Sequence, residues 1–153
     1  MIRKAIEKDI EALTDMFARM YRLNSEFDPL LEVPQDLEEK VRESIKKSFN
    51  KDDVLLIVVE EDGKVVGGAR VFISDREFYI PQKVGIIQEI YVYPSYRRKG
   101  IGEEIINYIE KELKEKGIDT VLARFPAKNV IATSFYVKKG FRELHNEYIR
   151  NIE

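Results

Sequence analysis

A basic turn that contains two glycines is the segment of this sequence best suited to chemistry. Its key residues are Arg97, Arg98, Lys99, Gly100 and Gly102. An apolar stretch precedes the turn and an apolar four-residue repeat follows it, so it should join a buried strand to the start of a helix. The first N–H groups of a helix lack partners and carry the positive end of its dipole, so they attract anions. Because glycines let the backbone approach a ligand closely, we predict a pyrophosphate site here.

The spacing of the glycines separates this turn from two other phosphate-binding loops. A dinucleotide-binding fold carries G-x-G-x-x-G early in the chain, with an acidic residue about 20 residues later. A nucleotide P-loop reads G-x-x-x-x-G-K-[ST]. Neither pattern occurs around Gly100. A solvated basic patch, in which the glycines only shape the turn, explains the same residues and stays open as an alternative.

The rest of the composition excludes several kinds of site. The 153 residues include no cysteine and one histidine, so we expect no thiolate nucleophile, no disulfide and no metal. A net charge of −2 gives no general attraction to nucleic acid or to an anionic membrane. No apolar run approaches the ~20 residues that span a bilayer. We therefore expect a cytoplasmic protein with neither a nucleic acid nor a membrane as partner.

Apolar periodicity indicates which elements hold the turn, within a single domain over residues 1–153. Predicted helices cover about 9–24, 37–45, 101–113 and 130–138, and predicted strands cover 54–59, 65–73, 84–92, 120–124 and 141–152. Asp62 and Gly63 should form a hairpin turn between the first two of these strands. The pattern indicates an α/β or α+β fold, with mainly antiparallel strands first and one strand-helix-strand crossover after them.

Two segments of the chain resemble a known family, the GCN5-related N-acetyltransferases. Arg97-x-x-Gly100-x-Gly102, after a strand ending in Ile90-Tyr91-Val92, is similar to the family's R/Q-x-x-G-x-G/A signature. Its second characteristic segment is matched by Asn129-x-x-Ala132-x-x-Phe135-Tyr136-x-Lys138-x-Gly140-Phe141. The opening residues 2–5 and 9–10 also look like a usual family start, so the resemblance covers nearly the whole chain. It implies a mixed, mostly antiparallel sheet splayed in its middle and flanked by about four helices.

The resemblance implies that acetyl-coenzyme A binds in the V of the splayed sheet. Its pantetheine would pair with the strand residues Ile90, Tyr91 and Val92. Its pyrophosphate would lie against a basic, glycine-containing run: Arg97, Arg98, Lys99, Gly100, Ile101, Gly102 and Glu103. Asn129 would contact the cofactor from the opposite arm.

The resemblance also assigns Tyr136 as the general acid that protonates the departing thiolate. The acetyl group would pass directly to an amine, without a covalent enzyme intermediate. An ordinary tyrosine pKa near ~10 keeps the phenol protonated at neutral pH. A tyrosine at helical spacing also fits a packing role.

The base has two candidates, Glu89 and a water molecule held by Gln88. Several family members carry Glu at the position that matches Gln88, and an amide is no useful proton acceptor. Alternation in the strand places Ile86, Gln88 and Ile90 on one face and Ile87, Glu89 and Tyr91 on the other, unless a bulge shifts the register. Glu89 is the available carboxylate, but it also fits a structural ion pair.

The acceptor should bind near Glu26, Phe27 and Asp28, between the first two helices, together with Gln88. The carboxylates could hold a cationic amine, although helix capping explains the same residues. We expect the acceptor to be a small amine or a protein amino group, and a homodimer is possible. A non-catalytic acyl-coenzyme A sensor and a nucleotide-phosphate binder remain alternatives to the enzyme.

Overall fold

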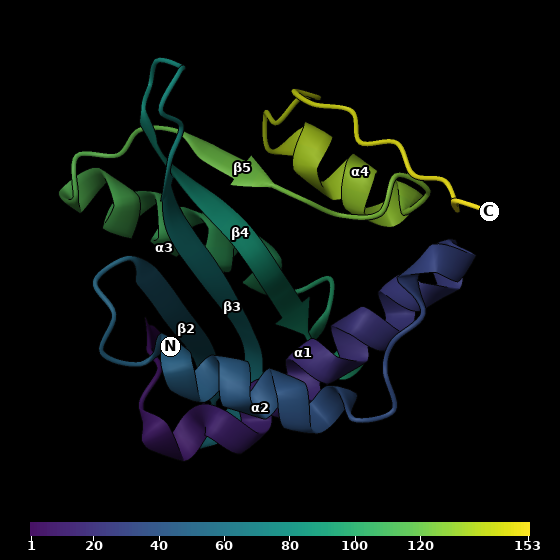
Figure 1. The fold of residues 1–153 in the computed structure, drawn as a ribbon. Helices are drawn as coiled ribbons and strands as arrows, with labels where there is room; N and C mark the ends of the chain where they lie inside the picture. Colours follow the sequence, from purple (N-terminus) through teal and green to yellow (C-terminus); the bar gives the residue numbers. More distant parts are fainter.

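The computed structural model describes residues 1–153, which form one mixed sheet with helices packed against it (Figure 1). The strands, in their order across the sheet, are β1 (Ile2–Lys4), β2 (Val54–Glu61), β3 (Lys64–Asp75), β4 (Lys83–Val92) and β5 (Val121–Ala123). The helices are α1 (Ile10–Asn24), α2 (Leu37–Ser48), α3 (Ile101–Glu115) and α4 (Val130–Lys138). Neighbouring strands are antiparallel except β4 and β5, which are parallel.

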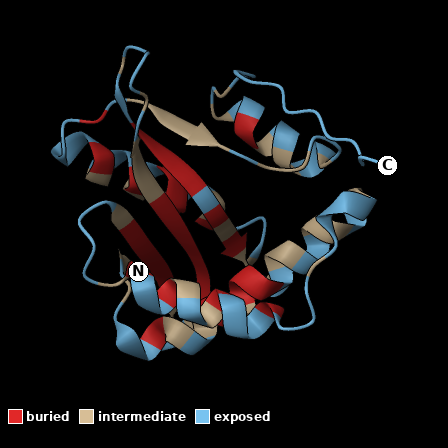
Figure 2. Ribbon diagram, viewed as in Figure 1, coloured by how far each residue is buried: buried red, intermediate tan, exposed pale blue.

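Helices cover both faces of the sheet, so its central strands are buried (Figure 2). On one face, Leu56 and Val58 of β2 pack with residues of α1 and α2. On the other face, Leu55, Ile57 and Val59 pack with residues of α3 and with Tyr136 of α4. A strand buried on both sides explains why 54–59 is continuously apolar instead of alternating.

Most elements expected from the sequence are present, and the mixed, mostly antiparallel fold is confirmed. Asp62 and Gly63 both have positive φ, 50° and 76°, as a tight hairpin turn between β2 and β3 requires. β1 was not among the expected strands, because its three residues are too short for a periodic signal. No helix combines the length and the apolar character needed to cross a membrane.

The strand expected over 141–152 is wrong. Residues 142–153 have no regular structure, and none of their backbone groups is hydrogen-bonded to another strand. Alternating side chains produce a strand only where a sheet edge accepts the backbone hydrogen bonds. The edge strand β5, which follows the crossover, extends for only three residues, Val121–Ala123.

Candidate functional site

The sheet opens between β4 and β5. Their pairing runs from Gly85 opposite Val121 to Ile87 opposite Ala123 and stops there. From Glu89 to Val92, β4 is paired with β3 alone. Figure 1 shows β4 diverging from the chain that follows β5. The unpaired edge of β4 can therefore hydrogen-bond an extended ligand in place of a strand.

A β-bulge marks the start of this opening. Arg70 of β3 lies opposite Glu89, and its neighbour Val71 lies opposite Ile87, so Gln88 has no partner. The extra residue changes the alternation of side chains along β4. Ile87 packs on the α3 face, together with the partly buried Ile90.

The bulge corrects the simple alternation expected from the sequence. Glu89 and Tyr91 share the face covered by α1 and α2, but Ile87 lies on the opposite face from them. Gln88 is exposed at the point where the two strands part. The bulge thus gives the opening a polar, solvent-facing side chain and sends the adjacent carboxylate inward.

The basic turn has a backbone suited to an anion. The N–H groups of residues 98–103 have no acceptor within the protein, and the first helical bond of α3 runs from the Glu104 N–H to the Gly100 carbonyl. Arg98 and Gly100 both have left-handed φ, 66° and 81°. Such alternation turns successive N–H groups towards one concave surface. Together with the start of a 15-residue helix, it makes a site for a phosphate.

The three basic side chains of the turn have different surroundings. The Arg97 Nε donates to the Val92 carbonyl over 2.7 Å, and its guanidinium lies 5.0 Å from the centre of the Tyr91 ring. The Lys99 Nζ lies 5.4 Å from the centre of the Tyr96 ring. Arg97 therefore ties the turn to the end of β4. Arg98, exposed and without an ion pair, is left to face solvent or a ligand.

The two glycines of the signature serve different purposes. Gly100 needs the conformational freedom of glycine because its φ is 81°, and a Cβ there would meet only open space. At Gly102 an added Cβ would stand 3.2 Å from the Phe135 ring. Gly102 therefore allows α4 to pack closely against the start of α3, as well as keeping its own N–H accessible.

Tyr136 lies in an aromatic cluster on α4. It is stacked on Phe125 with a centroid distance of 5.1 Å and makes edge contacts with Phe135 and Phe141. Its hydroxyl makes no hydrogen bond within the protein. Burial raises the pKa of Tyr136 to about 12. The core cluster that contains Tyr136 also includes Ile101 of the turn.

Asn129 stands at the start of α4. Its side-chain oxygen accepts the Ala132 N–H over 3.0 Å, as an N-cap residue does. That hydrogen bond uses the oxygen and leaves the amide NH₂ group uncommitted, so the residue can cap the helix and still donate to a ligand.

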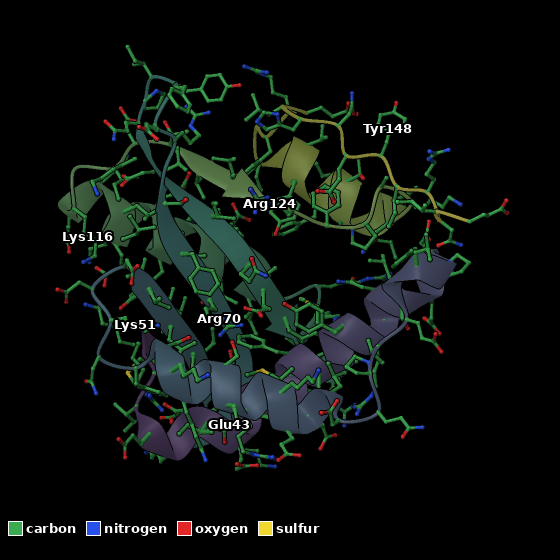
Figure 3. The ribbon with its side chains drawn as sticks, viewed as in Figure 1. Glu43, Lys51, Arg70, Lys116, Arg124 and Tyr148 are labelled. Atoms are coloured by element: carbon green, nitrogen blue, oxygen red, sulfur yellow. The ribbon has the colours of Figure 1, made fainter.

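Glu89 is the centre of a buried polar network. It is 1% exposed, and its two carboxylate oxygens accept from the Nε and Nη2 of Arg70 over 2.8 and 2.6 Å. The hydroxyl of Tyr21, on α1, donates to the Oε2 of Glu89 over 2.7 Å. Arg70, which lies between the sheet and α2 (Figure 3), also donates to Ser44 and Ser48. Glu89 is thus paired and hydrogen-bonded, as a buried charge must be.

The expected acceptor residues lie on two short 3-10 turns after α1. Glu26 is exposed and forms no ion pair, and Phe27 is half-buried. The Asp28 carboxylate accepts the Leu30 N–H over 2.9 Å and so caps the second turn. The capping role considered from the sequence therefore applies to Asp28, and Glu26 keeps a carboxylate free for a ligand.

The sequence reasoning did not identify Arg70 and Tyr21. Arg70 interrupts an otherwise apolar strand, as Glu89 does in the next one. Opposite charges in consecutive, buried strands were a signal that the two residues pair. Tyr21 carried no such signal, because its partner lies 68 residues away.

Comparison with known proteins gives the family. The Acetyltransferase (GNAT) family matches residues 11–141. The uncharacterised protein YrkN of Bacillus subtilis is 32% identical over 111 residues, which are 70% of this chain and 56% of YrkN. A spermidine N(1)-acetyltransferase of Thermoplasma acidophilum is 29% identical over 104 residues, which are 68% of this chain and 60% of that enzyme. The matched segments thus span less than two thirds of the length of these curated relatives.

A solved structure extends the likeness to the fold. A protein from Clostridium acetobutylicum, described as a predicted acetyltransferase and solved with acetyl-CoA, has a TM-score of 0.78 and 21% identity. The alignment covers 99% of this chain and 95% of that one. At this identity the likeness establishes the fold, and the family match over residues 11–141 establishes the relationship. This chain belongs to the acetyltransferase (GNAT) family.

Proposed function

We propose that this protein transfers the acetyl group of acetyl-coenzyme A directly to a primary amine. The observation that carries the proposal is the run of unpaired N–H groups over residues 98–103, beside the open edge of β4. The first feature binds a diphosphate and the second binds an extended amide chain, and coenzyme A contains both. A nucleotide would use the first feature but leave the edge of β4 unused.

In this proposal the cofactor lies along β4 and ends at the basic turn. Ile90, Tyr91 and Val92 present the strand edge to the pantetheine. The pyrophosphate accepts from the N–H groups of Arg98, Lys99, Gly100, Ile101, Gly102 and Glu103. Arg97 keeps the turn against β4 through its bond to the Val92 carbonyl. The free amide group of Asn129 donates from the α4 side.

Tyr136 is the proposed general acid. The amine attacks the thioester carbon, the oxyanion accepts a backbone N–H of β4, and the carbon–sulfur bond breaks as the thiolate takes the phenolic proton. With a pKa of about 12, Tyr136 is protonated throughout the neutral range. Its hydroxyl has no partner in the protein, so it is available to the sulfur.

A water molecule beside Gln88 is the proposed route for the proton that the amine loses. Glu89 was the other candidate base, but both of its oxygens already accept hydrogen bonds from Arg70. The hydroxyl of Tyr21 also donates to one of these oxygens, and Glu89 is 1% exposed, so the carboxylate is not open to an incoming amine. We therefore assign Glu89 a structural role and leave the proton to solvent at the exposed Gln88.

The proposed acceptors are small amines and protein amino groups. Glu26 supplies an exposed carboxylate near the end of α1 that could bind a second cationic group of a polyamine. The Thermoplasma relative, which is named for spermidine, makes that polyamine the first acceptor to try.

An acyl-coenzyme A sensor is the second candidate function. One observation favours it: the single carboxylate in the bulge region, Glu89, is fully engaged by Arg70 and Tyr21. A sensor would bind the cofactor without consuming it. Release of free thiol from acetyl-coenzyme A in the presence of spermidine, kanamycin or a lysine-containing peptide distinguishes the two functions, because only the enzyme releases it.

Neutralising the turn should weaken cofactor binding. We expect the double variant Arg98→Gln/Lys99→Gln to raise the Kd for acetyl-coenzyme A about five- to tenfold at low salt, since each exposed ion pair contributes up to ~1 kcal/mol. Binding should also depend less on ionic strength than in the wild type. Isothermal titration calorimetry at two salt concentrations measures both effects.

The matched control is Lys111→Gln/Lys114→Gln, which removes two positive charges from the outer face of α3. It should bind acetyl-coenzyme A as the wild type does. If both double variants lose the same affinity, or if the wild type binds no acetyl-coenzyme A, the proposed site is wrong.

A further inference from the structure

The hydroxyl of Tyr21 is held in one orientation by a buried charge. Tyr21 lies in the last turn of α1 and donates its proton to the Oε2 of Glu89 over 2.7 Å. The orientation of the Glu89 carboxylate is fixed, because its two oxygens accept hydrogen bonds from the Nε and Nη2 of Arg70. Arg70 is fixed in turn by the hydroxyls of Ser44 and Ser48 on α2. The phenol is therefore attached to a rigid support made of two strands and two helices.

This arrangement leaves Tyr21 with only hydrogen-bond acceptor capacity. A phenol has one O–H, and that of Tyr21 is committed to Glu89. Burial and the negative charge of Glu89 raise the pKa of Tyr21 well above its ordinary value, so it stays neutral. The carboxylate also polarises the O–H bond, which makes the oxygen a stronger acceptor for a further N–H group.

The oxygen of Tyr21 lies at the opening of the sheet. Its partner Glu89 directly follows Gln88 in β4, so the hydroxyl of Tyr21 lies within one residue of the bulge. Gln88 is the exposed, bulged residue where β4 separates from β5. Tyr21 is itself only half-buried, unlike Glu89 behind it. A tyrosine oxygen, held by a buried carboxylate, thus lies beside the bulge at which β4 leaves β5.

We propose that Tyr21 positions the acceptor amine by accepting one of its N–H groups. The inference rests on the proposed acetyl transfer. With one N–H directed at the Tyr21 oxygen, the lone pair of the amine nitrogen is free to attack the thioester carbon. The nitrogen–carbon bond forms, the carbon–sulfur bond breaks, and the thiolate takes the proton of Tyr136. The proton lost by the amine passes to water at Gln88, and none passes to Tyr21.

The test is the variant Tyr21→Phe, assayed by thiol release with spermidine, kanamycin and a lysine-containing peptide as acceptors. Loss of one hydrogen bond made equally in the ground and transition states should raise KM for the amine about three- to tenfold, with kcat within about twofold. The Kd for acetyl-coenzyme A should not change. The melting temperature should fall by only a few degrees, because Arg70 still holds both oxygens of Glu89.

Tyr93→Phe is the matched control. The hydroxyl of Tyr93 also donates to a carboxylate, the Oδ2 of Asp15 over 2.6 Å, and Asp15 lies on α1 as Tyr21 does. This control removes the same chemical group without touching Gln88, and its KM should equal that of the wild type.

The outcomes separate this inference from the proposed function. An unchanged KM in Tyr21→Phe, or an equal rise in Tyr93→Phe, overturns the role of Tyr21 while acetyl transfer stands. A wild-type protein that binds no acetyl-coenzyme A, or releases no thiol with any of the three acceptors, overturns the proposed function and the inference with it.

Discussion

Tyr136→Phe should lower kcat at least a hundredfold and leave the Kd for acetyl-coenzyme A within about twofold. General acid catalysis typically contributes about 10²–10⁴-fold, and the variant removes only the proton donor. The ring that packs on Phe125, Phe135 and Phe141 is kept. Because the hydroxyl bonds to nothing within the protein, its loss should leave the fold intact. Steady-state thiol release and calorimetry measure the two quantities.

The pH dependence gives a second check on Tyr136. Burial raises its pKa to about 12, so the acid should not titrate below about pH 10, and kcat should not fall between about pH 7 and 9 through loss of this proton. The raised pKa also makes the stability of the folded protein depend on pH. Its contribution to the free energy of unfolding is complete below the ordinary tyrosine pKa of ~10, and it is lost as the pH rises towards 12.

The control for this variant is Tyr148→Phe, since Tyr148 is exposed in the C-terminal segment. It should retain full turnover. A Tyr136→Phe protein with at least a third of the wild-type kcat would show that another group protonates the thiolate. If the wild type itself releases no thiol, the result supports the sensor function, and Tyr136 has no catalytic role.

The second large effect concerns stability. Arg70→Met should lower the free energy of unfolding by about 3–5 kcal/mol, because it leaves the charge of Glu89 buried without its partner. Arg70 is 5% exposed and Glu89 is 1% exposed, so solvent cannot replace the lost contact. Urea unfolding followed by circular dichroism measures the change.

The double variant Arg70→Met/Glu89→Gln provides the comparison. It removes both charges, and the Gln carbonyl can still accept the hydroxyl of Tyr21. It should recover a large part of the stability that the single variant loses, since replacing both members of a buried pair is often nearly neutral. Equal losses in the single and double variants would mean that the cost arises from packing and not from the charge.

The sequence predicted those parts of the fold that depend on local patterns. The apolar repeat after Gly100 predicted α3, and the sequence Asp62-Gly63 predicted the hairpin, because both signals lie within the element that they form. The resemblance to the acetyltransferases supplied the splayed sheet, which the structure confirms in the short β4–β5 pairing. The binding and catalytic roles of the individual residues stay predictions.

Other features depend on contacts that no local pattern records. The bulge at Gln88 is a matter of register between β3 and β4, and it decides which face receives Glu89. The bond between Tyr21 and Glu89 joins residues far apart in the chain. The strand expected over 141–152 failed for a related reason: alternation describes one strand, but a sheet needs a neighbour. Local sequence patterns therefore predicted the helices and strands better than they predicted the contacts between them.

The brevity of the β4–β5 pairing has a mechanical consequence. Three residue pairs join β5 to β4, and the α4 region is held by the burial of Tyr136 in the core, the ion pair of 2.8 Å between Lys139 and Glu103, and the packing of Phe135 on Gly102. A ligand bound to β4 on one side and to Asn129 on the other would connect the main sheet to the α4 region. Occupancy would then slow amide exchange in β5 and α4 more than in β2, because a bound ligand suppresses the opening motions that separate the groups it bridges.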